Sequence, residues 1–130
     1  MNEIYDFIKS CGTYFLATAD GTQPRVRPFG TVNIFEGKLY IQTGKSKDVS
    51  KQIQKNPHVE LCCMKGADWL RVSGELVRDD RREPKADMLA HYPDLQKMYS
   101  ADDDNTEVLY FKNATATFYS FTAAPKVVQF

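Results

Sequence analysis

The sequence predicts one mainly β domain with a few flanking helices (α+β elements), in which about six to seven antiparallel strands form a closed or partly closed β-barrel. Two observations predict this fold. Runs of β-branched and aromatic residues recur along the chain, and several are joined by tight turns such as Asp20-Gly21 and Glu36-Gly37. A length of 130 residues fits a single domain, residues 1–130, and no internal repeat or linker divides it.

The strands are predicted from their composition and from the turns between them. Because most of these turns are short, neighbouring strands are expected to pair as antiparallel hairpins. The strand that follows Gly66-Ala67 carries Leu70, Val72 and Leu76 on one face, as a half-buried strand should. The predicted strands are 13–19, 25–35, 38–43, 59–65, 69–78, 106–112 and 115–121.

Helices are predicted in three parts of the chain. Apolar residues at helical spacing predict a short amphipathic helix at residues 2–9. A second helix is expected at 47–55, with Ser46 as its N-cap. Residues 79–99 are predicted to be helical in two pieces that meet near Tyr92-Pro93.

Charge and composition exclude several classes of protein. The chain has 17 Lys and Arg and 17 Asp and Glu, so its formal net charge of zero argues against bulk electrostatic binding to nucleic acid. No apolar run is long enough to cross a membrane, and the charged first ten residues do not form a signal peptide. The three cysteines are expected to be reduced thiols in a cytoplasmic protein, with Cys62 and Cys63 in the core.

Familiar catalytic and metal-binding motifs are absent from the sequence. There is no glycine-rich dinucleotide fingerprint, P-loop, nucleophile elbow or zinc-protease motif. His58 and His91 are not spaced as a pair of metal ligands. The cluster Asp102-Asp103-Asp104 lacks the glycine and the final glutamate of a calcium loop, so a solvated loop is expected there. No metal site is predicted.

Three polar segments remain as candidates for a ligand site, and the first is Arg25-Val26-Arg27-Pro28. Arg25 and Arg27 share one face of a predicted strand, where two guanidinium groups could receive a phosphate or a polarised carbonyl. Taken alone, this segment fits a solvated hairpin edge better than a ligand site.

The second segment, Thr43-Gly44-Lys45-Ser46-Lys47, lies where a predicted strand passes into a helix. Helix amide groups, a serine hydroxyl and two lysines together make an anion site, and Gly44 would let the backbone approach a ligand closely. A capped helix start that is rich in lysine explains the same residues equally well.

The third segment is Trp69-Leu70-Arg71-Val72-Ser73-Gly74. Trp69 and Arg71 share the strand face opposite the apolar one, and a tryptophan there needs a partner. This partner could be a ligand ring, a second subunit or a covering helix. A covering helix is at least as common a partner as a ligand.

Together these segments suit a phosphorylated aromatic ligand, and in their order the chain resembles the pyridoxamine 5'-phosphate oxidase-like, FMN-binding split-barrel family, in its small single-domain branch. The resemblance runs through the N-terminal helix, the first hairpin, R-V-R-P, L-Y-I-Q-T-G-K-S-K, a helix ending in K-N-P, and W-L-R-V-S-G-E-L-V. It implies an antiparallel split β-barrel that forms a homodimer, with FMN bound at the subunit interface.

The resemblance also implies a role for each candidate residue. The strand with Arg27 would run beside the isoalloxazine ring, and Arg27 would reach the polar edge of the flavin. Thr43, Ser46 and Lys47 would hold the phosphate, with Lys45 as a helper. The implied cofactor-binding residues are Arg25, Val26, Arg27, Pro28, Thr43, Lys45, Ser46, Lys47, Trp69 and Arg71.

Trp69 and Arg71 would approach the flavin from the partner subunit or form the floor of the pocket. The chain departs from true pyridoxamine phosphate oxidases, because it is much shorter and ends in Pro125-Lys126-Val127-Val128-Gln129-Phe130 instead of their substrate-binding Arg/His pattern. Vitamin B6 chemistry is therefore not expected.

The expected activity is that of an FMN-dependent oxidoreductase acting on a small molecule. Flavin carries hydride itself, which agrees with the missing catalytic motifs, and a cation such as Arg27 would stabilise the reduced flavin. A non-catalytic split barrel that holds flavin or haem, as a sensor or carrier, is the alternative, and a deazaflavin could replace FMN. An oligonucleotide-binding barrel is disfavoured by the zero net charge and the single tryptophan.

Overall fold

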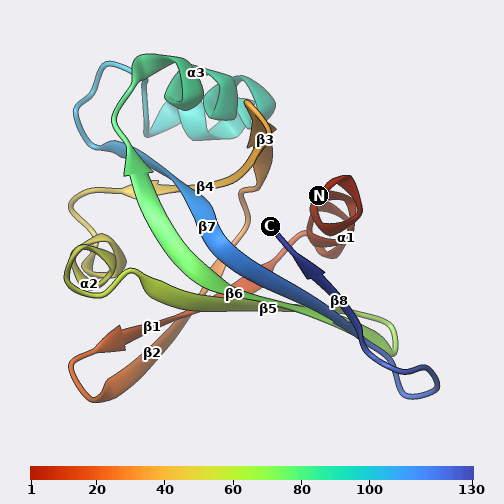
Figure 1. Cartoon of the computed structure of the whole chain (residues 1–130). Coiled ribbons are helices and arrows are strands. Elements are labelled where there is room, and N and C mark those ends of the chain that lie inside the picture. Colours follow the sequence, from red (N-terminus) through yellow and green to blue (C-terminus); the bar gives the residue numbers. More distant parts are fainter.

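Eight antiparallel strands form one strongly curved sheet in the computed structural model, which describes residues 1–130 (Figure 1). The strand order is β2-β1-β5-β6-β7-β4-β3, and β8 pairs with the second half of β7. The strands are β1 Tyr14–Asp20, β2 Gln23–Phe29, β3 Asn33–Phe35, β4 Lys38–Gly44, β5 His58–Lys65, β6 Asp68–Asp79, β7 Thr106–Tyr119 and β8 Lys126–Gln129. This confirms the predicted mainly β, antiparallel fold with flanking helices.

Three α-helices and one short 3₁₀ helix flank the sheet. They are α1 Asn2–Cys11, α2 Asp48–Lys55, α3 Arg82–His91 and the 3₁₀ helix η1 Pro93–Lys97. α1 buries Ile4 and Ile8 against the sheet, and α2 buries Val49 and Ile53. None of the helices has the length and apolar character needed to cross a membrane.

The core lies on the concave side of the sheet, and strand alternation decides which residues enter it. Along β5, for example, Val59, Leu61 and Cys63 are buried, whereas the residues between them point outward. The expectation that Cys62 is a core residue is therefore wrong, because Cys62 is exposed on the opposite face from the buried Cys63. All three cysteines are free thiols.

The predicted single strand at 25–35 is in fact two strands at opposite edges of the sheet. β2 pairs with β1 and β3 pairs with β4, so the chain crosses from one edge to the other between them. Two hydrogen bonds hold Thr31 of this crossing in place. The Tyr14 hydroxyl donates to the Thr31 carbonyl (2.7 Å), and the backbone amide of Gln42 donates to Thr31 Oγ1 (3.0 Å). The strand pattern alone does not reveal this change of edge.

The two strands predicted at 106–112 and 115–121 are one long strand, β7. A bulge absorbs the irregularity, because the register with β6 shifts between Ser73 and Glu75 while Asn113 takes a positive φ of 51°. Gly74 lies at the bulge, and a Cβ there would come within 2.9 Å of the Ala114 Cβ. β8 was not predicted; it pairs with β7 at positions 115–118.

The starts of two helices also differ from the prediction. α2 has Lys47 at its N-cap position without a side-chain capping bond, so Ser46 is not the cap. α3 begins only at Arg82, because β6 continues to Asp79. The predicted break near Tyr92-Pro93 is confirmed, since α3 ends at His91 and η1 begins at Pro93.

Candidate functional site

A cavity of about 720 Å³ lies where β2, the end of β4, the start of α2 and the α3–η1 segment meet. Four of the predicted site residues line it: Arg27 and Pro28 from β2, Thr43 from β4, and Lys47 at the N-cap of α2. Segments that lie far apart in the sequence thus bring the two cations, Arg27 and Lys47, and the buried Thr43 to one cavity.

Arg27 is held in place by neutral acceptors alone. Its guanidinium donates to Thr18 Oγ1 (2.7 Å), to the Leu16 carbonyl (3.2 Å) and to Gln52 Oε1 (2.6 Å). Burial lowers the pKa of Arg27 and the neighbouring Arg25 lowers it further, while Asp48 opposes the shift. Because arginine stays protonated even so, the cavity contains a partly buried positive charge that forms no ion pair with a carboxylate within 4.0 Å.

The turn that carries Lys47 is fixed by backbone bonds. The Lys47 amide donates to the Gly44 carbonyl (3.1 Å), and the Lys45 amide donates to the Asn105 carbonyl (2.7 Å). The backbone at Gly44 is closely approached, because a Cβ there would lie 3.1 Å from the Tyr99 hydroxyl and 3.2 Å from Asn105 Nδ2, and these side chains would have to move slightly. The close approach that we expected Gly44 to allow is therefore made by residues of the chain itself.

Lys45 and Ser46 belong to the same turn but do not line the cavity. Lys45 Nζ lies 3.3 Å from a carboxylate oxygen of Asp80 and 3.5 Å from one of Asp104. The Ser46 amide donates to Asn105 Oδ1 (3.1 Å). In this arrangement the two residues anchor the turn to the loop before β7.

A buried ion pair holds α2 against the sheet. Glu107 is completely buried and accepts a hydrogen bond from Arg78, whose guanidinium also donates to Ser50 Oγ in α2 (3.4 Å). Gln54, one turn further along α2, donates to the same carboxylate (3.5 Å). The pair fixes the helix that presents Lys47 and Gln52, and no sequence motif indicated this pair.

One wall of the cavity consists of residues that sequence reasoning did not assign to the site. It includes His91, Tyr92, Leu95, Met98 and Tyr99, from the end of α3, from η1 and from the segment after it. The Tyr92 hydroxyl donates to the Val32 carbonyl (3.0 Å) and accepts from the Val32 amide (3.0 Å), which fixes this wall to the crossing segment. An aromatic and apolar wall suits a planar ring.

Arg25 and Val26 line a second cavity of about 540 Å³, on the other side of Arg27 between the β1–β2 hairpin and α2. Arg27 lines both cavities. Arg25 forms an ion pair with Asp20 across the hairpin, with 3.3 Å between Nε and Oδ2. The segment that includes Arg25 and Arg27 therefore faces two neighbouring hollows.

Trp69 and Arg71 lie away from these cavities, on the outer face of β6. Trp69 stacks on Tyr119 of β7 with ring centroids 5.2 Å apart, and the Arg71 guanidinium lies 4.9 Å from the centroid of the same tyrosine ring. The intramolecular partner of Trp69 is thus a ring on the neighbouring strand. Within one chain, Trp69 and Arg71 do not meet Arg27, Thr43 and Lys47.

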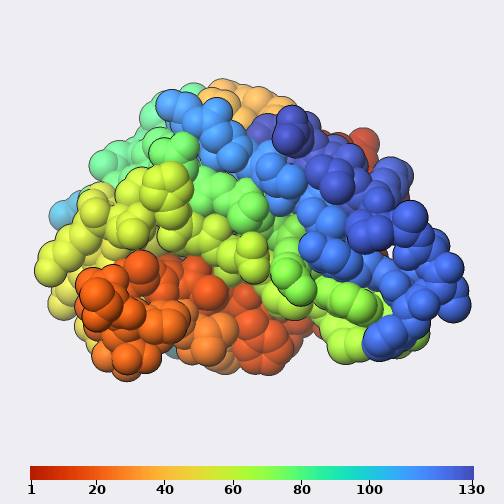
Figure 2. Space-filling model, turned by 60° about the horizontal axis from the view of Figure 1, so that its bottom comes forward, coloured from red at the N-terminus to blue at the C-terminus, as the bar shows by residue number.

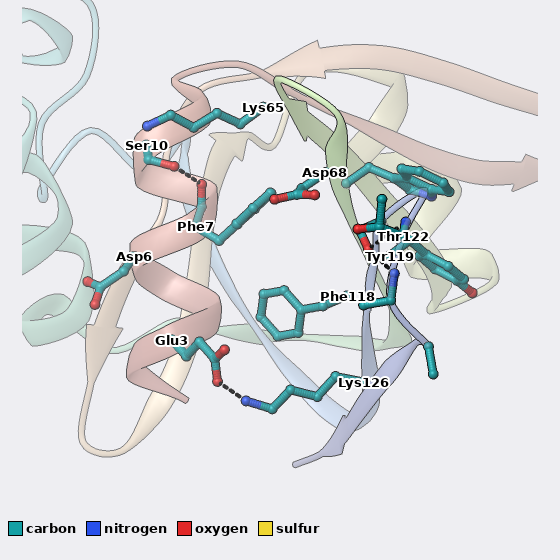
Figure 3. Close-up of a pocket in the computed structure, with 14 residues that line it drawn as sticks. Glu3, Asp6, Phe7, Ser10, Lys65, Asp68, Phe118, Tyr119, Thr122 and Lys126 are labelled. Carbon is teal, nitrogen blue, oxygen red and sulfur yellow. Dashed lines mark hydrogen bonds and ion pairs between the residues drawn. The ribbon is translucent and has the colours of Figure 1, made fainter.

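Trp69 also lines a third cavity, of about 930 Å³, between α1 and the end of β7 (Figure 3). Phe7 and Phe118 point into this space and pack edge to face, with ring centroids 5.8 Å apart. Lys126 and Glu3 form an ion pair across one end of it (2.7 Å). None of the predicted phosphate-binding residues lies there, so we do not assign the candidate site to this larger hollow.

A comparison with protein families decides which family these features represent. The family model described as pyridoxamine 5'-phosphate oxidase matches residues 1–120. The chain belongs to the pyridoxamine 5'-phosphate oxidase family. No curated protein sequence matches the chain significantly.

Solved structures similar to this family member support the split-barrel fold. A NimC/NimA family protein from Clostridium acetobutylicum is 44% identical with a TM-score of 0.96, over 100% of this chain and 92% of the other. General Stress Protein 26 from Bacillus anthracis is 16% identical with a TM-score of 0.75, over 98% of this chain and 97% of the other. A heme binding protein from Mycobacterium smegmatis is 11% identical with a TM-score of 0.73, over 92% of this chain and 53% of the other.

The outer face of this family member's sheet carries large exposed apolar side chains. Figure 2 shows the β1–β2 hairpin (orange), the β5–β6 region (yellow to green) and the C-terminal strands (blue) next to one another on one face of the molecule. Phe15 of β1 is 51% exposed, Met64 of β5 is 56% exposed and Val127 of β8 is 58% exposed. The strand register places Phe15, Cys62, Arg71 and Val127 in one row across this face. Val26 of β2, 67% exposed, is paired with Ala17 at the edge of the same face.

Proposed function

We propose that this protein binds FMN and acts as an FMN-dependent oxidoreductase on a small molecule. The observation that carries the proposal is the meeting of Arg27, Thr43 and Lys47 at one cavity of about 720 Å³ that is also lined by aromatic and apolar side chains. A lining that combines cations with aromatic rings matches a ligand that carries both a phosphate and a planar ring. Membership of the family supports the same class of ligand.

Each residue in this proposal has a distinct role. Thr43 and Lys47 hold the phosphate at the start of α2, where unpaired helix amides also favour an anion. Lys45 and Ser46 keep the turn in place through Asp80, Asp104 and Asn105. Arg27 and Pro28, the two residues of the Arg25–Pro28 segment that line this cavity, lie beside the ring.

The flavin supplies hydride transfer when it is bound, so the chain needs no nucleophile of its own. Arg27 stabilises the negative charge that develops on the polar edge of the ring, because its guanidinium is fixed by Thr18 and Gln52 and keeps its full charge.

We further propose that two copies pair through the outer sheet face and complete the site. Large exposed apolar side chains on one strand face are typical of an interaction surface, and a twofold interface would bury Phe15 and Met64 of both chains. In such a dimer, Trp69 and Arg71 reach the flavin from the second subunit. The three free thiols fit a reducing compartment, and we propose the cytoplasm.

A non-catalytic haem carrier is the second candidate, and one observation favours it. His91 lines the cavity, and its Nδ1 is 2.8 Å from the Asp87 carbonyl, which leaves Nε2 free. A histidine held through one ring nitrogen is the usual arrangement of a haem ligand. If haem is the cofactor, a Soret band should appear on titration and should shift in His91→Ala.

The absorption spectrum of the purified protein tests the proposed function, followed by steady-state turnover with NADH or NADPH. We expect flavin bands and oxidation of the nucleotide when an acceptor is present. If bound flavin is never reduced, the protein is a flavin carrier and the proposed oxidoreductase activity is refuted. A protein that takes up haem but no flavin would refute the FMN assignment.

A further inference from the structure

The second cavity, between the β1–β2 hairpin and α2, has the character of an anion site. Four basic side chains line it together with only two acidic ones, Asp20 and Asp48, so positive charge is in excess. Asp20 is already paired with Arg25. Val26 is the single apolar residue in the lining, so the hollow offers charge and hydrogen bonds but almost no surface for a ring.

The basic residues of α2 continue from the first cavity into the second. Lys47, Lys51 and Lys55 follow one another at spacings of four residues, so they lie along one side of the helix. Like charges at this spacing destabilise a helix, and none of the three lysines forms an ion pair with a carboxylate within 4.0 Å. Lys47 lines the first cavity, whereas Lys51 and Lys55 line the second.

Arg27 connects the two hollows. It lines both of them, and its hydrogen bonds go to neutral groups only, including Gln52, which also lines the second cavity. FMN carries one phosphate, which the proposed function places at Thr43 and Lys47. The cations beyond Arg27 are therefore surplus to FMN and remain available to another anionic group.

We propose that this second cavity binds the diphosphate of a reduced nicotinamide dinucleotide, the electron donor of the flavin. The inference rests on the proposed function. Its basic lining matches a diphosphate, and its position next to the first cavity lets the nicotinamide of the same molecule reach the flavin. The lysines and Arg25 are exposed, so a donor could enter and leave while FMN stays bound. In the reaction, hydride passes from the donor to the flavin, which leaves the nicotinamide oxidised and the flavin reduced by two electrons.

The test is anaerobic reduction of the FMN-loaded protein by NADPH or NADH, followed through the loss of flavin absorbance. The variant is Lys51→Gln with Lys55→Gln, and the matched control is Lys65→Gln with Lys112→Gln, two exposed lysines outside this cavity. We expect the half-saturating donor concentration to rise about tenfold in the variant only, while the limiting rate and the FMN dissociation constant stay unchanged. Added salt should raise the half-saturating donor concentration more in the wild-type protein than in the variant.

An equal half-saturating concentration in the variant and the control would overturn the inference, as would an FMN-loaded wild-type protein that neither nucleotide reduces. A second experiment compares the binding of FAD with that of FMN. If the wild-type protein binds FAD at least tenfold more tightly than FMN, and the lysine variant abolishes this difference, the cavity holds a second phosphate of the cofactor and the donor assignment is wrong. FMN occupancy is measured first, from absorption, so that failure of the proposed FMN binding appears separately, as a protein that binds no flavin.

Discussion

Arg27 is the residue on which the account of redox tuning depends. Its guanidinium is fixed by Thr18, Gln52 and the Leu16 carbonyl, and it has no carboxylate partner. A charge held this way stabilises an anion without first giving up an ion pair. Lys45 is the contrasting case, because Asp80 and Asp104 already lie beside it.

Arg27→Ala should lower the reduction potential of bound flavin more than it weakens the binding of oxidised FMN. The physical reason is that the negative charge near Arg27 appears only when the flavin is reduced. A spectroelectrochemical titration measures the potential, and binding curves for FMN and riboflavin measure the affinity. Arg25→Ala is the control, since Arg25 is paired with Asp20 and lies in the second cavity. If Arg27→Ala instead leaves the potential unchanged and costs FMN affinity, Arg27 is a phosphate ligand.

Asp79 should make stability depend on acid pH. Hydrogen bonds from the Arg81 side chain, assisted by the Tyr40 hydroxyl, lower the pKa of Asp79 to about 2. Since an unfolded aspartate titrates near pH ~3.9, this contribution is present above that pH and is lost as the pH falls through 2. It amounts to at most about 2.6 kcal/mol. Urea unfolding of the wild type and of Asp79→Asn should differ at pH 6 and converge towards pH 2, and a constant difference would contradict the assignment.

At the scale of the element, the bulge between β6 and β7 depends on Gly74. Gly74→Ala should lower the free energy of unfolding by about 1–3 kcal/mol, because the new Cβ would lie 2.9 Å from the Ala114 Cβ in a packed interior. Urea denaturation measures the change. Adding Ala114→Gly removes that methyl group and should recover part of the loss. If Gly74→Ala does not lower the free energy of unfolding, β6 and β7 move apart without cost at this position.

Elements with a strong local pattern could be predicted, and elements defined by long-range pairing could not. The alternation of Val59, Leu61 and Cys63 and the break at Tyr92-Pro93 are local signals, and both give the observed elements. The change of edge between β2 and β3 is different, because it depends on Tyr14 and Gln42, which are distant in the sequence from Thr31. β8 was missed for the same reason, since a four-residue strand is stabilised only by its pairing with β7.

The candidate site shows the same division. Arg27, Thr43 and Lys47 could be selected because cations and a threonine at strand and helix ends are typical of anion sites, and the structure brings them to one cavity. The wall from His91 to Tyr99 carries no such pattern, because its role comes only from the docking of Tyr92 onto Val32. Trp69 was a candidate because a tryptophan on the polar face of a strand needs a partner. In the folded chain that partner is Tyr119, on which its ring stacks.

At the scale of the whole molecule, the outer sheet face should hold two copies together. Light scattering should give twice the chain mass of 14.8 kDa, and Phe15→Arg with Met64→Arg should give a monomer, because two charges would be buried in an apolar interface. FMN affinity should fall at least tenfold in this monomer if the second subunit completes the site. Lys97→Glu, an exposed charge change in η1, is the control and should stay dimeric. A wild-type monomer that holds FMN at full occupancy would contradict the shared site.

The central claim, that Thr43 and Lys47 grip the phosphate of FMN, is tested most directly by comparing FMN with riboflavin in binding titrations of the wild type and of Lys47→Ala. Charge-assisted contacts to a phosphate contribute roughly 1.5–3 kcal/mol. We therefore predict that the wild type binds FMN much more tightly than riboflavin. In Lys47→Ala, FMN affinity should fall by about tenfold to a hundredfold, since each ~1.4 kcal/mol is a factor of ten, while riboflavin affinity hardly changes. Equal affinities of the wild type for FMN and riboflavin would contradict the claim.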